Sequence, residues 1–479
     1  MPEPSWSNNN SNEDLDPLSS FLSEWTDPEE DEEDFRSDFF RGQEGRRGKA
    51  ALALMTIWGT VIALHLISWG FWLVVSCTGI LLIHGVRILT TRPQPDPNPL
   101  TDAALANAPL VSLLVAAKNE EAVIGRLLRM LCTLDYPVDR YEVWAIDDRS
   151  TDRTPEILDR LAREYPQLKV LHRAAGAGGG KSGALNQILP LATGEIIGVF
   201  DADASVPPEM LRRIVPLFDD EAIGAVQMRK AIANAPLNFW TRGQQAEMAL
   251  DSYFQQQRIA AGGIGDLRGN GQFVRRKALE RCGGWNEQTI TDDLDLAVRL
   301  HLDRWDIGFC LVPAVEEEGV THAKALWHQR SRWAEGGYQR YLDYWRLIAS
   351  DRLGFPKTLD LLSFVLIQYI LPTAALPDVL MAVARHHLPI LSPISSLMMV
   401  WSTVAMSGGL YRIQRAKTQK IAFSDGLKIL AQTLMGLLYM LHWMVVMPAT
   451  TARMSVRPKR LKWVKTVHQG SGEEQFEVS

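Results

Sequence analysis

Short apolar runs alternate with amphipathic stretches through the middle of the chain, from about residue 110 to residue 220. The runs are rich in Val, Ile and Leu, which is typical of strands buried on both faces. They cover residues 110–116, 141–146, 168–171 and 195–200. Helical spacing of apolar residues separates them, over residues 121–134, 154–165, 181–191 and 208–218. This order predicts an α/β domain with a Rossmann-like, mostly parallel, doubly wound sheet.

A long apolar segment precedes this domain. Residues 50–89 are almost wholly apolar, with an interruption at Ser68-Trp69-Gly70. Because about 20 residues cross a bilayer as a helix, this length predicts a two-helix transmembrane hairpin. Basic residues flank both ends of the segment, which predicts that both ends lie in the cytoplasm.

Further membrane segments are expected after the α/β domain. Residues 361–376 and 388–410 are predicted to span, and the aromatic, amphipathic stretch 338–348 suits a membrane surface. Residues 429–447 are long enough to cross, yet six basic residues follow them. A crossing would place those charges outside, against the usual charge bias. We therefore interpret this segment as interfacial or re-entrant, unless the chain has an extra crossing.

Charge and cysteine content refine this organisation. The net charge of −6 gives no reason to expect a nucleic-acid partner, and thirteen of the first 40 residues are acidic. Such a segment is expected to be disordered. The four cysteines have no metal-binding or redox spacing, which favours a reducing cytoplasm. The predicted organisation is an acidic cytoplasmic tail (1–48), a transmembrane hairpin (50–90), the α/β domain (109–345), an interface helix with C-terminal membrane segments (346–450) and a basic, then polar, cytoplasmic tail (451–479).

Pairs of acidic residues end two of the predicted strands. Asp201 and Asp203 follow the run 195–200, and Asp147 and Asp148 end the run 141–146. Carboxylates at positions i and i+2 of an extended chain point the same way, as the ligands of a Mg²⁺ ion would. Ligands of doubly wound sheets bind beyond the carboxyl ends of the strands. Each pair alone could be a polar turn, but together they predict a shared site.

Two later motifs carry further candidate chemistry. Thr291 is expected to cap a helix, which leaves Asp293 free to take a proton from a hydroxyl group. The simpler interpretation is that the acids only favour the helix dipole. Gln329, Arg332 and Trp333 share one helix face, where they could offer a cation to a diphosphate and an indole to a sugar or acceptor. Interfacial anchoring is the alternative for this face.

A glycine-rich stretch before Lys181 and Ser182 imitates a phosphate-binding P-loop. The first glycine that such a loop requires is Ala175 here. A P-loop ATPase is therefore only a remote alternative. Lys181 remains a candidate countercharge for phosphate.

Taken in order, these motifs resemble those of the inverting family 2 glycosyltransferases with the GT-A fold, and the resemblance covers roughly residues 109–345. The motif from Gln329 to Trp333, together with the flanking membrane helices, narrows this resemblance to the cellulose- and hyaluronan-synthase-like branch of the family. The family's usual Thr-Glu-Asp is Thr291-Asp292-Asp293 here, which keeps the base position at Asp293.

Other segments resemble the cyanobacterial β-monoglucosyldiacylglycerol synthases, including residues 229–234, 268–276, 333–341 and 452–460. The resemblance implies transfer of glucose from UDP-glucose to 1,2-diacylglycerol at the bilayer, in a plasma or thylakoid membrane, with the catalytic domain in the cytoplasm. It implies these roles: Asp293 as base; Arg332 stabilising the departing UDP; Asp201 and Asp203 binding Mg²⁺ or Mn²⁺; Asp147, Asp148, Lys181, Gln329 and Trp333 contacting substrates. A processive polysaccharide synthase is the nearer alternative, although such enzymes usually have more spanning helices.

Overall fold

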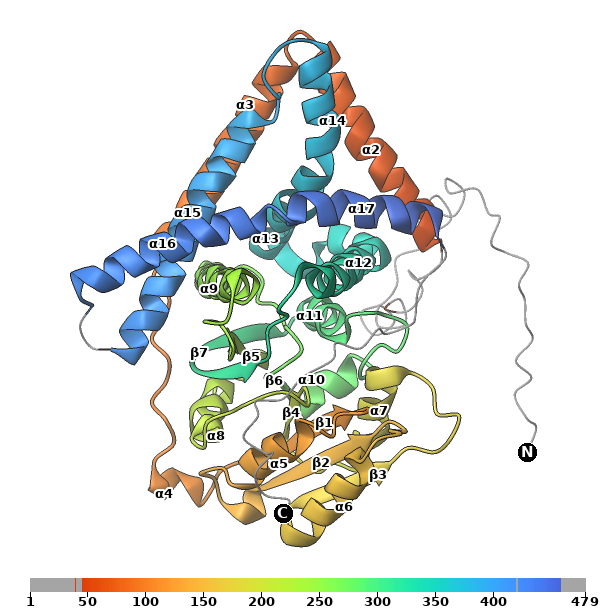
Figure 1. Cartoon of the computed structure of the whole chain (residues 1–479), viewed down its shortest axis with the longest axis vertical. Helices are drawn as coiled ribbons and strands as arrows, with labels where there is room; N and C mark the ends of the chain where they lie inside the picture. Colours follow the sequence, from red (N-terminus) through yellow and green to blue (C-terminus); the bar gives the residue numbers. More distant parts are fainter. Residues whose placement is uncertain (1–38, 40–44, 419–420, 458–479) are drawn as a thin grey trace.

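A seven-stranded sheet forms the centre of the catalytic domain in the computed structural model, which describes residue 39 and residues 45–418 and 421–457 (Figure 1). The strand order is β3-β2-β1-β4-β6-β5-β7. Only β6 runs antiparallel to its neighbours, so the prediction of a mostly parallel sheet is confirmed. The strands are β1 (Val111–Ala117), β2 (Tyr141–Asp147), β3 (Leu168–His172), β4 (Ile196–Phe200), β5 (Ile223–Ile232), β6 (Gln272–Arg275) and β7 (Asp306–Glu317).

Helices cover both faces of this sheet, because alternate residues of the central strands are apolar on both sides. Leu113 of β1 belongs to one buried cluster and Leu114 to the other. The first cluster includes α5 (Ile124–Cys132), α6 (Thr154–Glu164) and α8 (Met210–Ile214). The second includes α7 (Gly180–Ile188), α10 (Arg276–Arg281) and α11 (Asp292–Leu302). The four predicted helices are confirmed, although their ends differ by a few residues.

The region between residues 226 and 320 is more regular than its glycine-rich sequence suggests. It contributes strands β6 and β7 and most of β5, together with the 22-residue helix α9 (Phe239–Ala260). Asn238 caps α9 by accepting hydrogen bonds from the backbone N–H groups of Trp240 and Thr241. The 27-residue helix α12 (Ala323–Ala349) unites the predicted Gln329–Trp333 face and the amphipathic stretch 338–348.

Helices α9 and α12 connect the catalytic domain to the membrane helices (Figure 1). On α9, the Gln257 side chain donates to the carbonyl of Ile88, 2.7 Å away, and accepts from Arg412, 2.9 Å away. On α12, Asp343 forms a buried ion pair with Arg46. These long-range polar contacts fix the membrane helices on the domain.

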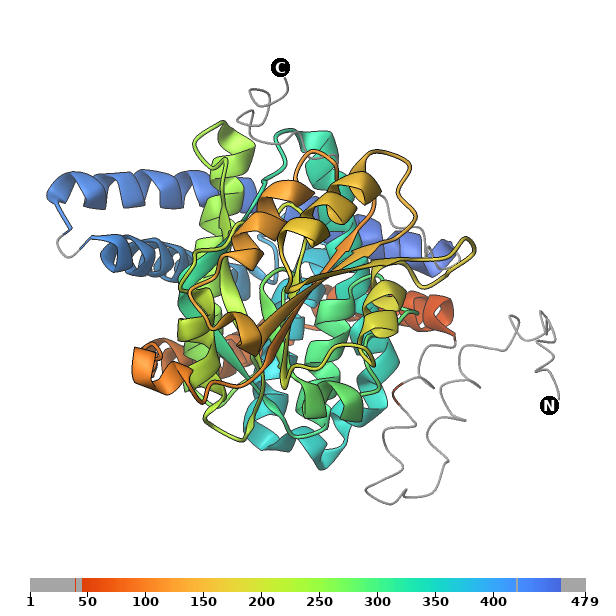
Figure 2. The ribbon, with the colours of Figure 1, turned by 90° about the horizontal axis from the view of Figure 1, so that it is seen from below.

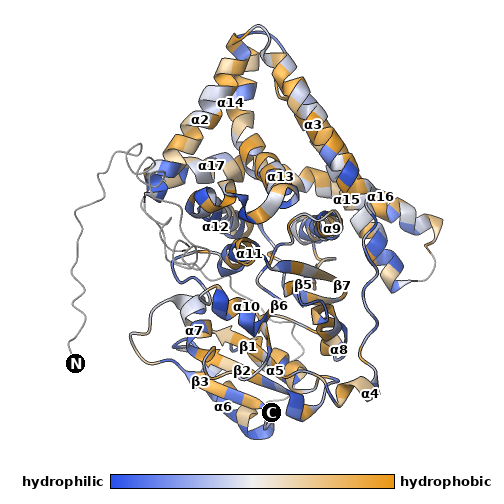
Figure 3. Ribbon diagram, turned by 180° about the vertical axis from the view of Figure 1, so that it is seen from behind, coloured by the Kyte–Doolittle hydropathy of each residue, from blue (hydrophilic) through white to orange (hydrophobic). Residues whose placement is uncertain are grey.

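The predicted two-helix hairpin is present as α2 (Arg46–Leu66) and α3 (Gly70–Thr90), each long and apolar enough to span a membrane. After α12 come α13 (Gly354–Val365), α14 (Leu371–Ala384), α15 (Ser392–Lys417), α16 (Phe423–Met440) and α17 (Trp443–Val456). Figures 1 and 3 show α2, α3, α14 and α15 converging on an apex far from the sheet, with many hydrophobic residues along them. The hairpins meet there through His65 and Asp378, whose side-chain atoms lie 2.7 Å apart.

Composition and packing describe two of the predicted membrane segments differently. Within the described part of the chain, four stretches are long and apolar enough to span: Arg46–Leu66, Gly70–Thr90, Asp351–Ala384 and Phe423–Val456. Helix α15, which contains the predicted span 388–410, is not among them because serines and threonines interrupt its apolar residues. The segment 429–447, which we interpret as interfacial, does belong to them by composition.

The packing of these helices differs from what their composition suggests. Helix α15 runs beside α3, and Gly85 of α3 lies against the Trp401 ring. Helices α16 and α17 lie across the base of the four converging helices instead of running with them (Figure 1). Viewed from below, α16 projects sideways beyond the catalytic domain (Figure 2). The predicted acidic tail, apart from Phe39 and residues 45–48, and the tail after Arg457 lie outside the described residues.

Candidate active site

The acidic residues that end β2 and β4 share one edge of the sheet. Strand β1 lies between these two strands, with Ala117 beside Asp147 and Val115 beside Phe200. Asp201 follows Phe200 directly. Since neighbouring strands lie about 4.8 Å apart, the two acidic pairs are about two strand spacings from one another.

Asp201 is paired with Lys181, the second residue of α7. The Lys181 ammonium donates to Asp201 Oδ1 over 2.5 Å. Burial by itself would raise the pKa of Asp201, but Lys181, Lys230 and Arg332 hold that pKa below its usual value. Asp201 is therefore an ionised carboxylate in a cationic environment.

Asp203 is more deeply buried than Asp201 and is held by the end of β7. Its Oδ2 atom accepts a hydrogen bond from the Glu318 backbone N–H, 3.2 Å away. The Asp203 residue is 8% exposed, whereas 40% of the Asp201 side chain is exposed. Asp201 therefore has the more accessible carboxylate of the two.

The side chains near Asp201 and Asp203 indicate what kind of metal ion these carboxylates could bind. No group of three or more His, Cys, Asp or Glu side chains suited to a metal occurs among the described residues. Mg²⁺ is commonly bound by one or two carboxylates, with water and substrate phosphates completing its six oxygen ligands. Asp201 and Asp203 fit an ion that arrives with a phosphate, rather than a resident ion in a protein cage.

Asp293 lies in the first turn of α11, next to Asp292. Burial and the neighbouring Asp292 charge raise the pKa of Asp293 to about 6, although Lys181 and Lys230 act against this rise. Asp295 of the same turn is different, because it is buried and binds Arg299 and Tyr344. Asp293 therefore has the pKa expected of a general base at neutral pH, whereas Asp295 is structural.

The expectation that the Thr291 side chain caps α11 is wrong. Thr291 occupies the N-cap position, but its side chain makes no capping hydrogen bond. The hydroxyl instead packs against Gly336 of α12, where an added Cβ atom would overlap it. Close contact between the two helices has replaced the cap.

Arg332 of α12 interacts electrostatically with the site carboxylates, and Trp333 lies beside two cationic side chains. Burial lowers the pKa of Arg332, and Asp201, Asp293 and Asp292 oppose that change because their charges stabilise the guanidinium. The Trp333 ring has the Lys230 ammonium 5.6 Å and the Arg330 guanidinium 4.0 Å from its centroid. Arg332 and Asp293, far apart in the sequence, are thus brought together.

Gln329, on the same helix, has a protein partner. Its Oε1 atom accepts a hydrogen bond from Arg330, 3.0 Å away. Any contact that Gln329 makes with a substrate would have to coexist with this bond or replace it.

Asp147 and Asp148 have more protein partners than the sequence suggests. Asp147 accepts from the Ser150 backbone N–H and lies 3.3 Å from His172. Asp148 pairs with Arg173 over 2.7 Å. The sequence predicts open acceptors for a nucleoside here, but the structure engages both carboxylates with neighbouring side chains and backbone.

Arg173 also fixes the glycine-rich stretch before Lys181. Its guanidinium donates to the carbonyls of Gly178 and Gly180, over 2.5 and 3.2 Å. Gly179, at φ 77°, is the N-cap residue of α7. Asp148 is thereby linked through Arg173 to the loop that presents Lys181.

Two residues near Asp201 are not among those that the sequence predicts. Lys230, near the end of β5, pairs with Glu317 of β7 over 2.7 Å. Asn270 accepts from the Asp201 backbone N–H, 3.3 Å away, and donates to Glu317, 3.5 Å away. The positive φ angles of Gly269 and Gly271 on either side of Asn270 mark a special turn. Lys230 and Asn270 also lie within the segments 229–234 and 268–276 that carry the family resemblance, but the resemblance assigned no role to either residue.

Comparison with known proteins explains this arrangement. The family profile described as "Glycosyltransferase like family 2" matches residues 108–336. The β-monoglucosyldiacylglycerol synthase of Synechocystis sp. is 59% identical over 479 residues, which cover 100% of this chain and 99% of that protein. The chain belongs to glycosyltransferase family 2. The synthase of the same name from Trichormus variabilis is 60% identical over 474 residues, covering 99% of this chain and 100% of that protein.

The fold of this family 2 glycosyltransferase has a counterpart among solved structures. The mannosyltransferase PcManGT from Pyrobaculum calidifontis, solved in complex with GDP-Man and Mn²⁺, matches with a TM-score of 0.50 and 22% identity, covering 80% of this chain and 99% of that one. At this identity the match concerns the fold alone, and the predicted GT-A fold is confirmed. Family membership also removes the P-loop ATPase alternative.

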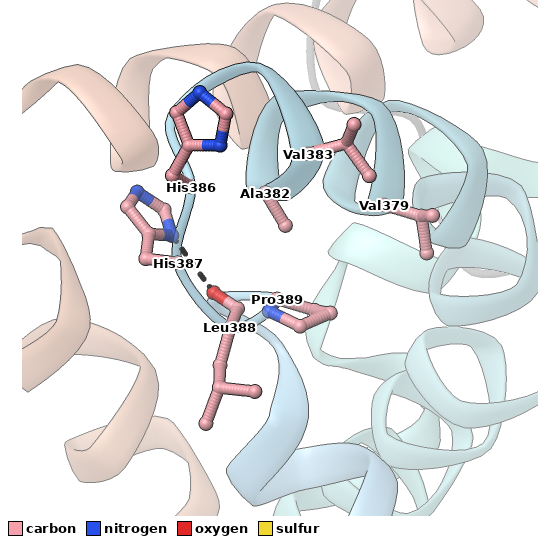
Figure 4. Close-up of a pocket in the computed structure, with 7 residues that line it drawn as sticks. All are labelled: Val379, Ala382, Val383, His386, His387, Leu388 and Pro389. Atoms are coloured by element: carbon pink, nitrogen blue, oxygen red, sulfur yellow. Dashed lines mark hydrogen bonds between the residues drawn. The ribbon is translucent and has the colours of Figure 1, made fainter.

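One hollow among the described residues lies away from this site. It lies at the turn between α14 and α15, at the apex of the membrane helices, and Figure 4 shows its lining residues. His387 Nδ1 lies 2.9 Å from the Leu388 carbonyl oxygen there. No residue predicted for catalysis or substrate binding lines it.

Proposed function

We propose that this protein transfers glucose from UDP-glucose to the free hydroxyl of 1,2-diacylglycerol with inversion, giving β-monoglucosyldiacylglycerol and UDP. The observation that supports it most directly is identity of 59–60% along the whole chain to synthases of that name. Such end-to-end similarity includes the membrane helices as well as the catalytic domain. It therefore favours this lipid acceptor over a growing polysaccharide.

The donor would lie across the carboxyl ends of β2, β1 and β4. Lys181 and Arg332 supply positive charge for a diphosphate, and Asp147 and Asp148 lie where the nucleoside is expected. Asp201 and Asp203 would hold Mg²⁺ or Mn²⁺, which, when bound, neutralises negative charge on the diphosphate as a Lewis acid. Because Lys181 occupies an Asp201 oxygen, we expect it to move onto phosphate when the donor binds.

Asp293 would accept the proton of the acceptor hydroxyl. The hydroxyl oxygen forms a bond to the anomeric carbon as the bond from that carbon to UDP breaks, and Arg332 stabilises the departing charge. Attack from the face opposite UDP inverts the anomeric centre, so an α-linked donor gives a β-product. A base with a pKa of about 6 is ionised at neutral pH and still accepts a proton readily.

The acceptor is expected to stay in the bilayer, because each buried methylene of its chains is worth about 0.8 kcal/mol. Helix α16 has a row of exposed leucines opposite the face that packs on the protein. A helix of this kind suits the membrane surface. We therefore propose an integral membrane protein whose catalytic domain faces the cytoplasm, at a plasma or thylakoid membrane, where soluble UDP-glucose meets the lipid.

The decisive experiment incubates membranes that contain the protein with labelled UDP-glucose and dioleoylglycerol. We expect a chloroform-soluble product with one glucose per lipid and a β linkage by nuclear magnetic resonance. Labelled UDP-galactose, tested in parallel, should give much less product. An insoluble polymer would instead indicate a processive synthase, and the absence of any labelled lipid would refute the proposal.

A further inference from the structure

A buried polar cluster joins the catalytic helix α12 to the transverse helices α16 and α17. It consists of Arg330 on α12, Glu247 on α9, Tyr439 on α16 and Trp443 on α17. Arg330 is fully buried and donates to the Glu247 carboxylate and to the Tyr439 hydroxyl, the latter over 3.0 Å. The Trp443 indole N–H donates to the other Glu247 oxygen over 2.8 Å.

Burial of these charged groups is unfavourable for stability, which indicates that the cluster has another role. Burying an ion pair brings a desolvation cost that can exceed the attraction between the charges, so such pairs are weak sources of stability. Every link of this cluster joins groups from different helices, at sequence separations of 83, 109, 192 and 196 residues. Its effect is to fix the position of α12 relative to the junction of α16 and α17.

The cluster also contacts Trp333 at the proposed site. The Arg330 guanidinium lies 4.0 Å from the centroid of the Trp333 ring and 5.9 Å from that of Trp443. Trp333 also contacts the Lys230 ammonium. Arg332, which precedes Trp333 in the chain, interacts electrostatically with Asp293. Movement of Arg330 would therefore also displace Trp333, which lies beside the proposed site.

The junction of α16 and α17 has two faces with different surroundings. On one, the Tyr439 ring lies against Gly243 of α9, where no Cβ atom would fit. On the other, five exposed leucines continue along α16 to the junction at helical spacing: Leu427, Leu430, Leu434, Leu438 and Leu441. The junction thus connects a lipid-compatible surface to helix α12 through one buried cluster.

We propose that Arg330, acting through Glu247, Tyr439 and Trp443, is a positioning residue for the lipid acceptor. This inference rests on the proposed function. The acyl chains lie along the exposed leucine row of α16, and the cluster holds Trp333 at the height where the hydroxyl reaches Asp293. Helices α16 and α17 are therefore part of the acceptor site as well as an anchor.

The test uses Tyr439→Phe and Trp443→Phe, which keep an aromatic ring and remove one hydrogen bond each. In proteoliposomes of the full chain, we expect the KM for dioleoylglycerol to rise about tenfold, because each variant removes a hydrogen bond to a charged group of the buried cluster. The KM for UDP-glucose and the binding of UDP should stay unchanged. A general loss of structure would instead change both KM values together.

The matched control is Gln432→Ala. Gln432 of α16 donates to Gln245 of α9 over 2.9 Å, so it also links these two helices but lies outside the cluster. We expect this variant to leave both KM values unchanged. Arg330→Lys keeps the charge but loses the planar stacking on Trp333, and should reproduce the acceptor effect.

Three outcomes decide the inference. An unchanged KM for dioleoylglycerol in folded Tyr439→Phe and Trp443→Phe would overturn it, as would an equal rise in the KM for UDP-glucose. If Gln432→Ala gave the same acceptor effect, the cluster would have no special role. Failure of the wild-type protein to glucosylate any lipid would refute the proposed function itself, which distinguishes the two failures.

Discussion

At the scale of single residues, the environment gives similar carboxylates different tasks. Asp201 is kept ionised by Lys181, Asp293 is made more basic by burial and by Asp292, and Asp295 is fully engaged by structural partners. Separating the pKa values of neighbouring acids is a general way for enzymes to assign acid and base roles. The three aspartates are indistinguishable by type, so only their neighbours assign these roles.

Asp293→Asn should abolish glucose transfer, because an amide cannot accept the hydroxyl proton. We expect kcat to fall by about 10²- to 10⁴-fold while UDP binding is retained. Isothermal titration with UDP and Mg²⁺, alongside the labelled-sugar assay, measures both quantities. Turnover close to that of the wild type would exclude Asp293 as the base.

The pH dependence of kcat/KM should report the Asp293 carboxyl of the free enzyme. The base works only when deprotonated, so activity should be lost as the pH falls through about 6 and should be constant above it. Asp292→Asn removes a like charge, which should lower the pKa of Asp293 and shift the acid limb toward lower pH. A pH–rate profile between pH 5 and 8 checks this. An unshifted limb would mean that the two carboxyl groups do not interact.

Asp201→Ala should uncouple UDP binding from the metal. In the wild-type protein we expect Mg²⁺ to strengthen UDP binding, whereas in the variant Mg²⁺ should make little difference. Calorimetric titrations of UDP with Mg²⁺ and with a chelator provide the comparison. Equal enhancement by Mg²⁺ in both proteins would show that the ion is held elsewhere.

At the scale of elements, α12 is the helix on which the proposed site depends. It carries Arg332 and Trp333, and its glycines bring it close to its neighbours. Gly336 lies against Thr291 of the α11 N-terminus, and Gly337 lies against the Tyr369 hydroxyl group. A side chain at either position would push α12 away from a neighbour. The distance between Arg332 and Asp293 is therefore set by backbone packing two or more residues away from each.

Gly336→Ala tests this packing. The added methyl group overlaps Thr291, and overpacking of this kind costs about 1–3 kcal/mol, so the melting temperature and kcat should both fall. Thr291→Ala in the same chain should recover part of the loss. Gly59→Ala is the control, because Gly59 lies in α2 with no atom within 4 Å of the added Cβ. Equal losses for both alanine variants would refute the packing argument.

At the scale of the whole molecule, the membrane helices form two units with different directions. Helices α2, α3, α14 and α15 converge on an apex away from the sheet, and α16 with α17 crosses their base (Figure 1). Composition alone would count Phe423–Val456 as a span and would leave α15 out. Contacts decide otherwise, since α15 packs along α3 and the inner face of α16 packs on α9.

Cysteine labelling of intact vesicles should reveal this topology. Single cysteines replacing Lys428 on α16 and Arg457 after α17 should react with an impermeant maleimide from the same side, if both helices lie along the surface. A cysteine replacing His386 at the apex should react only from the opposite side. Reaction of the Lys428 and Arg457 positions from opposite sides would mean that the segment crosses the membrane.

Much of the architecture was predictable because it depends on local periodicity. The first four strands, the helices between them and the hairpin of α2 and α3 follow from apolar spacing. The candidate roles of Asp293 and Arg332 followed from motif order and family resemblance. Lys230 and Asn270 escaped because their partners, Glu317 and Asp201, are distant in the sequence.

The parallel sheet, the acidic strand ends and the long apolar helices can be predicted from local pattern, because each depends on side chains a few positions apart. The pairing of Asp148 with Arg173, the packing of Thr291 on Gly336 and the transverse course of α16 depend on the folded arrangement. These features arise where distant segments meet. Burial and charge at such meeting points depend on every neighbour at once, which no local pattern records.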